Sequence, residues 1–449
     1  MTLNREKIEE KIWNAAEFLK NSSVLNSNEI LLILSRLLVI KRLTDESNQM
    51  DSSFIIPIED KWEHLLAGER QKKSLFTNIL DLIEKKNNYF KNVLLTSGFK
   101  KAMEKINDYT LNGALDIINN SEFILDNNHF EDCFDLGDIF RDLIDLTAFR
   151  DNNVQGDYYS PNIIARIIIK LLEPKEYDSI CDPAFGSGGF LIETFKYFYQ
   201  NQRDALTCQF YGQEINLETY SLGKINFFLN NMINLNVKLG DTIRDPQLMN
   251  DEKDLKKYDI VIVDPPWNQK WEKGKFLEED DYQRFKYGVP PTASADWLWV
   301  EHIIATLNEK GRAAVILDKG SLFRIHEKKI RKNIIKNDLI EAVIDLPSNM
   351  FYSNYLPACI LILNRKKTNN LKNKIYFFKI ESDEISRSNN TLSEININSI
   401  VLSYKKKEEK NFLSNLVEIN EIQRHEYNLL PKLYINDYSE IAKERGLNV

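Results

Sequence analysis

The stretch CDPAFGSGGF, residues Cys181–Phe190, decides the fold of this protein. It follows the short, partly apolar segment YDSI and precedes LIETFKYFY, which is typical of an α-helix. Three of the 16 glycines in the 449 residues stand here, at Gly186, Gly188 and Gly189. Glycine permits a positive φ and a close approach of the backbone to a ligand. We therefore expect a strand, a tight loop against a nucleotide-like ligand, and a helix.

Predicted strands and helices alternate around this loop. The predicted helices cover 160–174, 190–200, 216–232 and 294–310, and the last is stopped by Gly311. The first helix has Ser160 as its N-cap and Pro161 at its first position. The predicted strands lie within 178–181, 208–215, 236–243, 258–263, 312–318, 339–351 and 358–367. This alternation predicts an α/β fold, a doubly wound Rossmann-like sheet with helices on both faces.

The chain is too long for one hydrophobic core, so we expect two or three domains. Residues 1–150 are predicted to form a helical N-terminal domain, because segments such as 27–43 show helical spacing. Residues 151–375 carry the alternating pattern, and residues 376–449 are predicted to form a C-terminal extension and helical tail for subunit contact. Within this extension we expect a polar loop over 386–399 and a helix with a short extended piece over 416–435.

The composition restricts the class of protein. Hydrophobic residues make up 43% and charged residues 28% of the chain, which is ordinary for a soluble globular protein. The net charge of −8 argues against a protein that grips nucleic acid over its whole surface. Two basic segments, 326–336 and 404–410, are the best local candidates for such contact. Each taken alone is better interpreted as a solvated surface.

The sequence predicts neither a membrane span nor a structural metal. The apolar run 30–40 is too short to cross a bilayer, and the N-terminal residues lack the apolar core of a signal peptide. The four cysteines form no Cys-x-x-Cys pair, and the five histidines show no zinc-ligand spacing. We therefore expect reduced thiols, a cytoplasmic location and no metal site.

Acidic residues follow successive predicted strands at the edge where the glycine loop lies. In an open α/β sheet, ligands bind beyond the carboxyl ends of the strands. Asp182 opens the loop, Glu214 ends the second strand and Asp241 ends the third. Glu214 can accept hydrogen bonds from ribose hydroxyls, and Asp241 from an adenine amino group. Without the Gly-Lys-Ser/Thr of a phosphate loop, the set suits S-adenosylmethionine. A tight turn with two N-capping acids is the alternative.

The second candidate site is the sequence DPPW at Asp264, Pro265, Pro266 and Trp267, directly after the predicted strand 258–263. Prolines there end the strand and stiffen the loop, which a purely structural turn also needs. The amino nitrogen of adenine is a poor nucleophile because its lone pair is delocalised into the ring. Asp264 and the Pro265 carbonyl can each accept one amino hydrogen and draw that nitrogen toward tetrahedral geometry. Trp267 can stack on a base flipped out of the duplex.

Together these motifs resemble those of amino-group methyltransferases that use S-adenosylmethionine. The series DPAFGSGGF, GQEI, GDT and DPPW follows their order, and Asp or Asn before the two prolines leans toward adenine N6. More narrowly, the chain resembles the modification subunit of type I restriction enzymes over nearly its whole length. IWNAAEFLKNS and LLVIKRLTDE resemble the helical N-terminal domain of that family, GDYYSP its signature before the cofactor loop, and EYNLLPKLYI its tail.

The resemblance implies an activity, a cofactor site and partners. The activity is site-specific DNA adenine-N6 methylation with S-adenosylmethionine. The implied cofactor contacts are Asp157, Tyr158, Tyr159, Ser160, Pro161, Asn162, Ser187, Gly188, Gly189 and Glu214, beside Asp182, Gly186 and Asp241 from the loop and strand-end pattern. The implied partners are DNA, a separate specificity subunit and a restriction subunit, in a hetero-oligomer with two modification subunits. The chain shows no evident base-reading module, which agrees with a separate specificity subunit.

The chain departs from the family pattern at several positions. Asn162 stands where the family often has Arg, Ser160 replaces Thr, and Phe185 replaces a common Cys or Ala. The family usually has Asn-Pro-Pro-Phe/Tyr, whereas Asp264 and Trp267 here keep an acceptor oxygen and an aromatic face. Two alternatives remain open. One is a protein-glutamine N5-methyltransferase, whose amide nitrogen poses a similar chemical problem, and the other is a non-catalytic cofactor-binding scaffold.

Overall fold

The computed structural model describes residues 5–47, 54–56, 62–67, 71–119, 123–125, 134–150, 162–347, 357–380, 394–407 and 413–435. By packing, the chain divides into two compact units. The helical unit comprises Met1–Tyr159, Gly186–Gly188 and Asn216–Asn234. The sheet unit comprises Ser160–Phe185, Gly189–Ile215 and Leu235–Val449.

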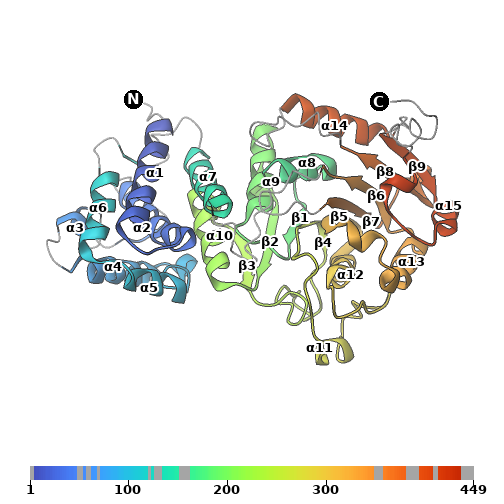
Figure 1. Ribbon diagram of the computed structural model, residues 1–449, viewed down its shortest axis with the longest axis horizontal. Helices are drawn as coiled ribbons and strands as arrows, with labels where there is room; N and C mark the ends of the chain where they lie inside the picture. Colours follow the sequence, from blue (N-terminus) through green and yellow to red (C-terminus); the bar gives the residue numbers. More distant parts are fainter. Residues whose placement is uncertain are drawn as a thin grey trace. The chain divides into compact units, whose positions relative to one another are not determined.

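The helical unit confirms the predicted helical N-terminal region (Figure 1). Its helices are α1 (Arg5–Ser22), α2 (Ser27–Ser47), α3 (Trp62–Ala67), α4 (Lys72–Lys86), α5 (Ser97–Glu104), α6 (Asp108–Ile118), α7 (Asp135–Arg150) and α10 (Leu217–Leu229). A short 3-10 helix, Asn88–Phe90, follows α4. Helix α2 is buried from Ile30 to Thr44. A helix that is apolar on nearly all sides lies inside a bundle, so α2 is the centre of this unit.

Helix α10 is part of the core of the helical unit, although it follows the second strand of the sheet in sequence. Its Leu222, Ile225 and Phe228 are buried with the N-terminal helices. The buried guanidinium of Arg36 in α2 donates to the Ser221 hydroxyl at 2.6 Å and to the Leu94 carbonyl at 3.0 Å. Apolar burial and a buried hydrogen-bonded cation therefore fix α10 within this unit.

In the sheet unit, nine strands of the described residues form one sheet. They are β1 (Ser179–Asp182), β2 (Gln209–Glu214), β3 (Leu235–Leu239), β4 (Tyr258–Val263), β5 (Leu307–Asp318), β6 (Ile340–Asp345), β7 (Ala358–Asn364), β8 (Lys374–Lys379) and β9 (Ser414–Glu418). Their order is β3-β2-β1-β4-β5-β7-β6-β8-β9. Strand β7 is antiparallel to β5 and β6, and β9 is antiparallel to β8, while the other neighbours are parallel. All seven predicted strands are confirmed.

The strand order reverses between β1 and β4. Cys181 of β1 pairs with Tyr211 of β2 on one side and with Val261 of β4 on the other. The chain runs from β1 outward to β3 and then returns to the centre as β4. In open α/β sheets this switch point, at the carboxyl ends of the strands, is where ligands bind. The residues that close β1 and β4 are therefore candidates for the functional site.

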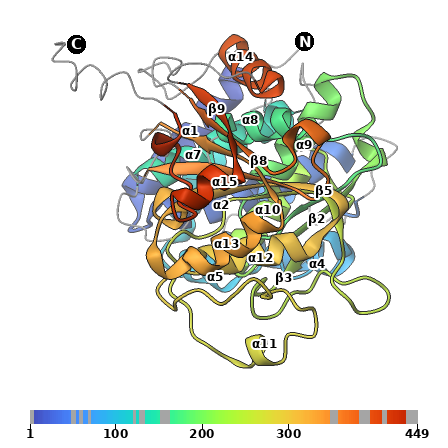
Figure 2. The ribbon, with the colours of Figure 1, turned by 90° about the vertical axis from the view of Figure 1, so that its right-hand side faces the viewer.

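Helices cover both faces of the sheet, as predicted (Figures 1 and 2). One face carries α8 (Asn162–Leu172), α9 (Gly189–Gln200) and α14 (Glu394–Lys406), and the other carries α12 (Asp296–Thr306) and α13 (Lys328–Lys336). Two short helices complete the unit: α11 (Lys275–Glu278) lies in a loop beyond these layers, and α15 (Ile419–Arg424) packs against α13. Strand β4 is buried on both sides, which explains its unbroken apolar run.

The helix predicted over 294–310 is shorter than expected, because it ends at Thr306. Gly311 lies inside β5 rather than at a helix end. A Cβ at this position would stand 2.8 Å from the Tyr258 carbonyl, where the register between β4 and β5 shifts. Gly311 is therefore a site of close backbone approach within the sheet, which the sequence shows only as a helix stop.

The C-terminal part of the chain adds both strands and helix. Strand β8 spans the predicted boundary at residue 375, and the domain limits stay a prediction. The loop expected over 386–399 is wrong from Glu394 onward, because α14 begins there. Its Ile397, Ile400 and Tyr404 are buried at helical spacing, so burial overrides the polar composition. Residues 386–393 lie outside the described residues. The short extended piece and helix expected over 416–435 are β9 and α15.

Candidate active site

Asp182 closes β1 and is 1% exposed. Its Oδ1 accepts the Ala184 amide at 3.1 Å, whereas its buried Oδ2 has no hydrogen-bond partner among the described residues. Burial raises the pKa of this carboxyl well above its ordinary value, and the nearby Glu214 and Asp264 carboxylates raise it further. A buried carboxylate oxygen without a partner is costly. A ligand that brings a positive charge or a donor would lower that cost.

The glycine loop after β1 has the predicted backbone conformation. Gly186 has φ 54° and Gly188 has φ 85°. A Cβ at Gly188 would meet the Phe227 ring at 2.5 Å, so both backbone and space require glycine there. The Ser187 carbonyl accepts from the Asn226 side chain at 2.9 Å, within the helical unit. Gly189 is the first residue of α9, as expected for a loop that leads into a helix.

The loops after β2 and β3 are tied to each other. Glu214 ends β2, and its carbonyl accepts the Gly240 amide at 2.8 Å. The buried Gln213 side chain accepts the Gln247 amide at 2.9 Å. Asp241 is less available than predicted, because its Oδ1 accepts the Ile243 and Arg244 amides, both at 2.9 Å. Asp241 thus stabilises its own turn, whatever it does for a ligand.

Asp264 follows β4 directly and is half-buried. Its Oδ1 accepts a hydrogen bond from the indole Nε1 of Trp267 at 3.0 Å. Pro265, between them, is buried. This hydrogen bond fixes the orientation of the indole ring relative to the carboxylate. A phenylalanine at the position of Trp267 could not make it, because its ring has no donor.

Asn268 ends the DPPW turn in the left-handed region, with φ 54°. Its amide donates to Oδ1 of Asp296 at 3.0 Å, and its side-chain oxygen accepts from Nη2 of Arg324. Asp296 is fully buried and is the first residue of α12. The start of α12 and Arg324 therefore hold the backbone of the turn directly after Trp267.

Arg324 connects several acids at this edge of the sheet. It donates to Asp296 at 2.9 Å, to Asp318 at 2.5 Å and to Glu327 at 3.4 Å. Asp318 is the last residue of β5, the strand beside β4. Burial raises the pKa of the Glu327 carboxyl to about 7. Sequence reasoning missed this network, although the strand-end position of Asp318 is the same signal that singled out Glu214 and Asp264.

A second cation braces the loop that follows the turn. Arg284 is buried and donates to Asp280 at 2.8 Å and to the Ile243 carbonyl at 2.9 Å. The buried Glu301 of α12 accepts the Tyr287 amide at 2.9 Å. The loop after DPPW is thus attached both to α12 and to the loop that contains Asp241. No sequence motif predicts these contacts.

The structure brings three of the predicted acids together. Of the predicted signature before the glycine loop, it describes only Asn162. Glu214 and Asp264 both act electrostatically on Asp182, at the carboxyl ends of β2, β4 and β1. Asn162 is the first residue of α8, and its buried Oδ1 has no hydrogen-bond partner among the described residues. The remaining residues of the predicted signature, Asp157, Tyr158, Tyr159, Ser160 and Pro161, lie outside the described residues.

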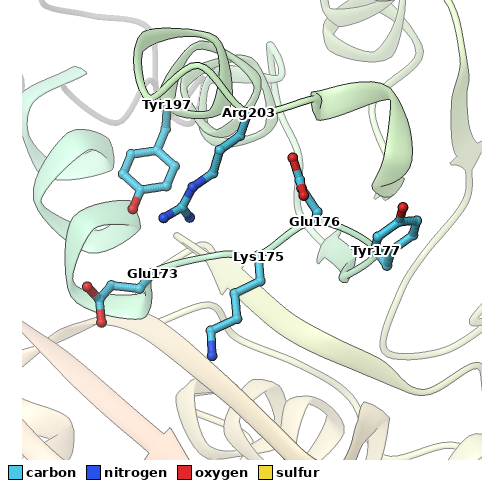
Figure 3. A pocket seen from close by; sticks show the side chains of 6 residues that line it. All are labelled: Glu173, Lys175, Glu176, Tyr177, Tyr197 and Arg203. Atoms are coloured by element: carbon cyan, nitrogen blue, oxygen red, sulfur yellow. The ribbon is translucent and has the colours of Figure 1, made fainter.

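A cavity of about 420 Å³ lies elsewhere in the sheet unit (Figure 3). Its lining residues are Glu173, Lys175, Glu176, Tyr177, Tyr197 and Arg203. The lining segment 173–177 precedes β1, so the cavity is at the amino-terminal edge of the sheet, opposite to Asp182. Because ligands of such sheets bind at the carboxyl edge, we do not assign the reaction to this cavity.

Neither a metal cluster nor a membrane-spanning helix is present in the part of the chain that the structure describes. These residues contain no group of three or more His, Cys, Asp or Glu that could hold a metal ion. In the same residues, no helix has the length and apolar character needed to cross a membrane.

The fold is of the methyltransferase type. Its marks are the strand order of the sheet, the antiparallel β7 and the acids at the strand ends. A type I restriction-modification methyltransferase subunit from Streptococcus thermophilus shares this fold, with a TM-score of 0.83 and 22% identity. The match covers 97% of this chain and 100% of that one. The chain belongs to the N-6 DNA methylase family, whose model matches residues 131–443.

Two curated relatives come from Methanocaldococcus jannaschii. The MjaVIII methylase subunit of a type I restriction enzyme is 31% identical over 84% of this chain. The MjaVII methylase subunit of a type I restriction enzyme is 35% identical over 63% of this chain. This chain spans 66% of the length of the first relative and 49% of the length of the second.

Proposed function

We propose that this chain is a DNA adenine-N6 methyltransferase, the modification subunit of a type I restriction-modification system. The observation that carries the proposal is the group of Asp182, Glu214 and Asp264 at the carboxyl ends of β1, β2 and β4. The membership of the N-6 DNA methylase family and the names of the relatives support it. These acids stand at the switch point where this fold binds its ligand.

The residues at this edge fit S-adenosylmethionine as the cofactor. The orphaned Oδ2 of Asp182, and the repulsion of its charged form by Glu214 and Asp264, favour a ligand with a positive charge and donors. We assign to it Asp182, Gly186, Ser187, Gly188, Gly189, Glu214 and Asp241, together with Asp157, Tyr158, Tyr159, Ser160, Pro161 and Asn162. When bound, the cofactor supplies a methyl group on a sulfonium centre, which is open to attack by a nucleophile. Glu214 accepts from the ribose hydroxyls.

The catalytic residues we assign are Asp264, Pro265, Pro266 and Trp267. The second carboxylate oxygen of Asp264 and the Pro265 carbonyl accept the two amino hydrogens of a flipped adenine, which frees the nitrogen lone pair. Pro266 stiffens the turn, and Trp267 stacks on the base. The bond from Trp267 to Oδ1 of Asp264 keeps both groups in place before the base arrives. Such preorganisation reduces the cost of reaching the transition state.

The partners are part of the same proposal. Both curated relatives are named as methylase subunits, which supports a subunit rather than a self-sufficient enzyme. We propose that DNA specificity comes from a separate subunit, in a hetero-oligomer with two modification subunits, and that a restriction subunit can join. The 1–150 and 376–449 domains flank the 151–375 core and are the candidates for subunit contact.

The test is methyl transfer by the assembled complex. We expect the complex of this chain with its specificity subunit to place N6-methyladenine at one defined sequence, read by single-molecule sequencing. Asp264→Ala should abolish the methylation and leave binding of S-adenosylmethionine, measured by calorimetry, within about threefold of wild type. The control is Glu309→Ala, an exposed acid near the amino end of β5, which should change neither. Methyl groups found on a protein glutamine instead of DNA would contradict the proposal.

A further inference from the structure

An exposed apolar pair lies beside the proposed target site. Phe323 is 45% exposed and Ile325 is 81% exposed, the highest value for a large apolar side chain among the residues that the structure describes. Both belong to the short connection between β5 and α13, at the carboxyl edge of the sheet. Single exposed apolar side chains are common on protein surfaces, so the meaning of this pair depends on what lies beside it.

The pair is held against the DPPW turn by the residue between them. Arg324 donates to the side chain of Asn268, which follows Trp267 in the chain. The same guanidinium is anchored to Asp296 at 2.9 Å and to Asp318 at 2.5 Å. The backbone on both sides of Arg324 therefore has little freedom to move away from the turn. Phe323 and Ile325 lie next to the place where we propose that the adenine is received.

A row of lysines continues this surface along α13. Lys329, Lys332 and Lys336 are spaced three and four residues apart, so they share one helix face, while Ile330 and Ile334 are buried on the other. The segment 326–336 contains five Lys or Arg and one Glu in a chain of net charge −8, although Arg331 is buried. This is one of the two basic segments singled out from the sequence, where a solvated face was the better interpretation. The start of this segment follows Arg324, which contacts the DPPW turn, and this changes that interpretation.

We propose that this surface, the wedge surface formed by Phe323, Ile325 and the α13 lysines, binds the duplex around the target base. The inference rests on the proposed function. Ile325 and Phe323 enter the base stack where the adenine has left, and Lys329, Lys332 and Lys336 contact the neighbouring phosphates. Apolar wedges of this kind compensate the unstacking that base flipping requires.

The chemistry of the surface favours DNA over a protein partner. A protein interface would bury an apolar centre with few charges, whereas here the apolar pair is continued by a cationic helix face. A duplex offers both complements, because its base stack is apolar and its backbone carries regularly spaced negative charge. The wedge surface is also continuous with the DPPW turn, where we propose that the adenine binds, and this favours DNA as well.

The test uses Ile325→Ala in the complete complex with the specificity subunit. Two duplexes are compared, one with the target adenine paired normally and one with an abasic site opposite it, where the base leaves the stack easily. Ile325→Ala should lower methylation of the paired duplex by about tenfold or more and that of the second duplex by less than about threefold. With 2-aminopurine at the target position, the variant should show less flipping fluorescence on the paired duplex. Binding of S-adenosylmethionine should be unchanged.

Two controls separate the wedge from general effects. Leu206→Ala removes an apolar side chain of similar exposure, 72%, located before β2 at the opposite edge of the sheet, and should behave as wild type. Lys329→Ala should weaken DNA binding and reduce the salt slope of log Kd by about one, whereas Lys372→Ala, exposed before β8, should not.

The outcomes are distinguishable. Equal losses on both duplexes, unchanged activity of Ile325→Ala, or loss of the specificity subunit from the variant complex would each overturn the wedge assignment. The last of these would make the surface a protein interface. If the proposed function is wrong, the wild-type complex will form no N6-methyladenine on either duplex. That result would refute the wedge assignment as well, since the assignment rests on the proposed function.

Discussion

Asp264→Asn is expected to impair methyl transfer in this chain, although Asn is the usual residue of the family at that position. The indole Nε1 of Trp267 donates to Oδ1 of Asp264 at 3.0 Å. In the proposed mechanism the other carboxylate oxygen accepts an adenine amino hydrogen. An asparagine offers only one oxygen. Whichever way its amide is turned, the NH₂ group faces either the indole N–H or the adenine amino group.

The size of the effect follows from this conflict between donors. A donor without an acceptor in a partly buried site costs about 1–3 kcal/mol. This lowers kcat/KM by roughly 5- to 160-fold, since about 1.4 kcal/mol corresponds to a factor of ten. Trp267→Phe removes the indole donor, so the amide oxygen of Asn can serve the adenine alone. The double variant Asp264→Asn/Trp267→Phe should therefore recover about 1–3 kcal/mol relative to the sum of the single variants.

The assay is a double-mutant cycle on the assembled complex. The kcat/KM for transfer of a labelled methyl group to the duplex is measured for the wild type, both single variants and the double variant. Calorimetry should give similar cofactor affinities for all four. Asp251→Asn, at an exposed position before β4, is the control for an Asp-to-Asn change. Strictly additive single effects, or wild-type kcat/KM for Asp264→Asn, would refute the reasoning.

Three other substitutions test the surroundings of the site. Arg324→Lys should lower kcat by roughly 10–100-fold at unchanged cofactor affinity, because an ammonium cannot hold Asn268 and the acids together. The control Arg312→Lys, in the middle of β5, should leave kcat unchanged, and equal effects of the two changes would contradict this role of Arg324. Glu214→Ala should weaken binding of S-adenosylmethionine by roughly 10–150-fold in calorimetry, because the ligand loses a hydrogen bond to a charged acceptor. An unchanged affinity would show that Glu214 is not part of the site. Burial raises the pKa of Glu301 from 4.5 to about 8. Between these two pH values the native state holds a proton that the unfolded chain has lost, so the free energy of unfolding falls as the pH rises from about 4.5 to about 8. Glu301→Gln should raise the melting temperature at pH 8 more than at pH 5, and an equal change at both would exclude this titration.

The candidate site could be located from the sequence because its signals are local. Asp182, Glu214 and Asp264 each follow an apolar strand, and parallel strands bring their carboxyl ends to one edge. The positive φ at Gly186 and Gly188 was foreseeable from residue type alone. The bond between Trp267 and Asp264 was not, because a motif states which side chains are near in sequence but not which atoms they share.

The support of the site lies beyond the reach of sequence patterns. Arg324 reaches Asn268 across 56 residues of chain, and Arg284 reaches the Ile243 carbonyl across 41. Such contacts depend on how loops from different strands meet, and no period or spacing encodes them. The wedge surface is a case of the same kind. Its lysines are visible in the sequence, but the place of Phe323 and Ile325 beside the DPPW turn is set by the Arg324 network.

The sequence by itself determined the alternation of strands and helices, the glycine loop and the acids at the strand ends, because each depends on residue type over a few neighbouring positions. Only the tertiary structure decided that Gly311 lies within β5, that 394–399 is helical and that α10 packs with the N-terminal helices. In each case the free energy comes from burial against residues distant in the chain, which outweighs local preference and is not recorded in the local sequence.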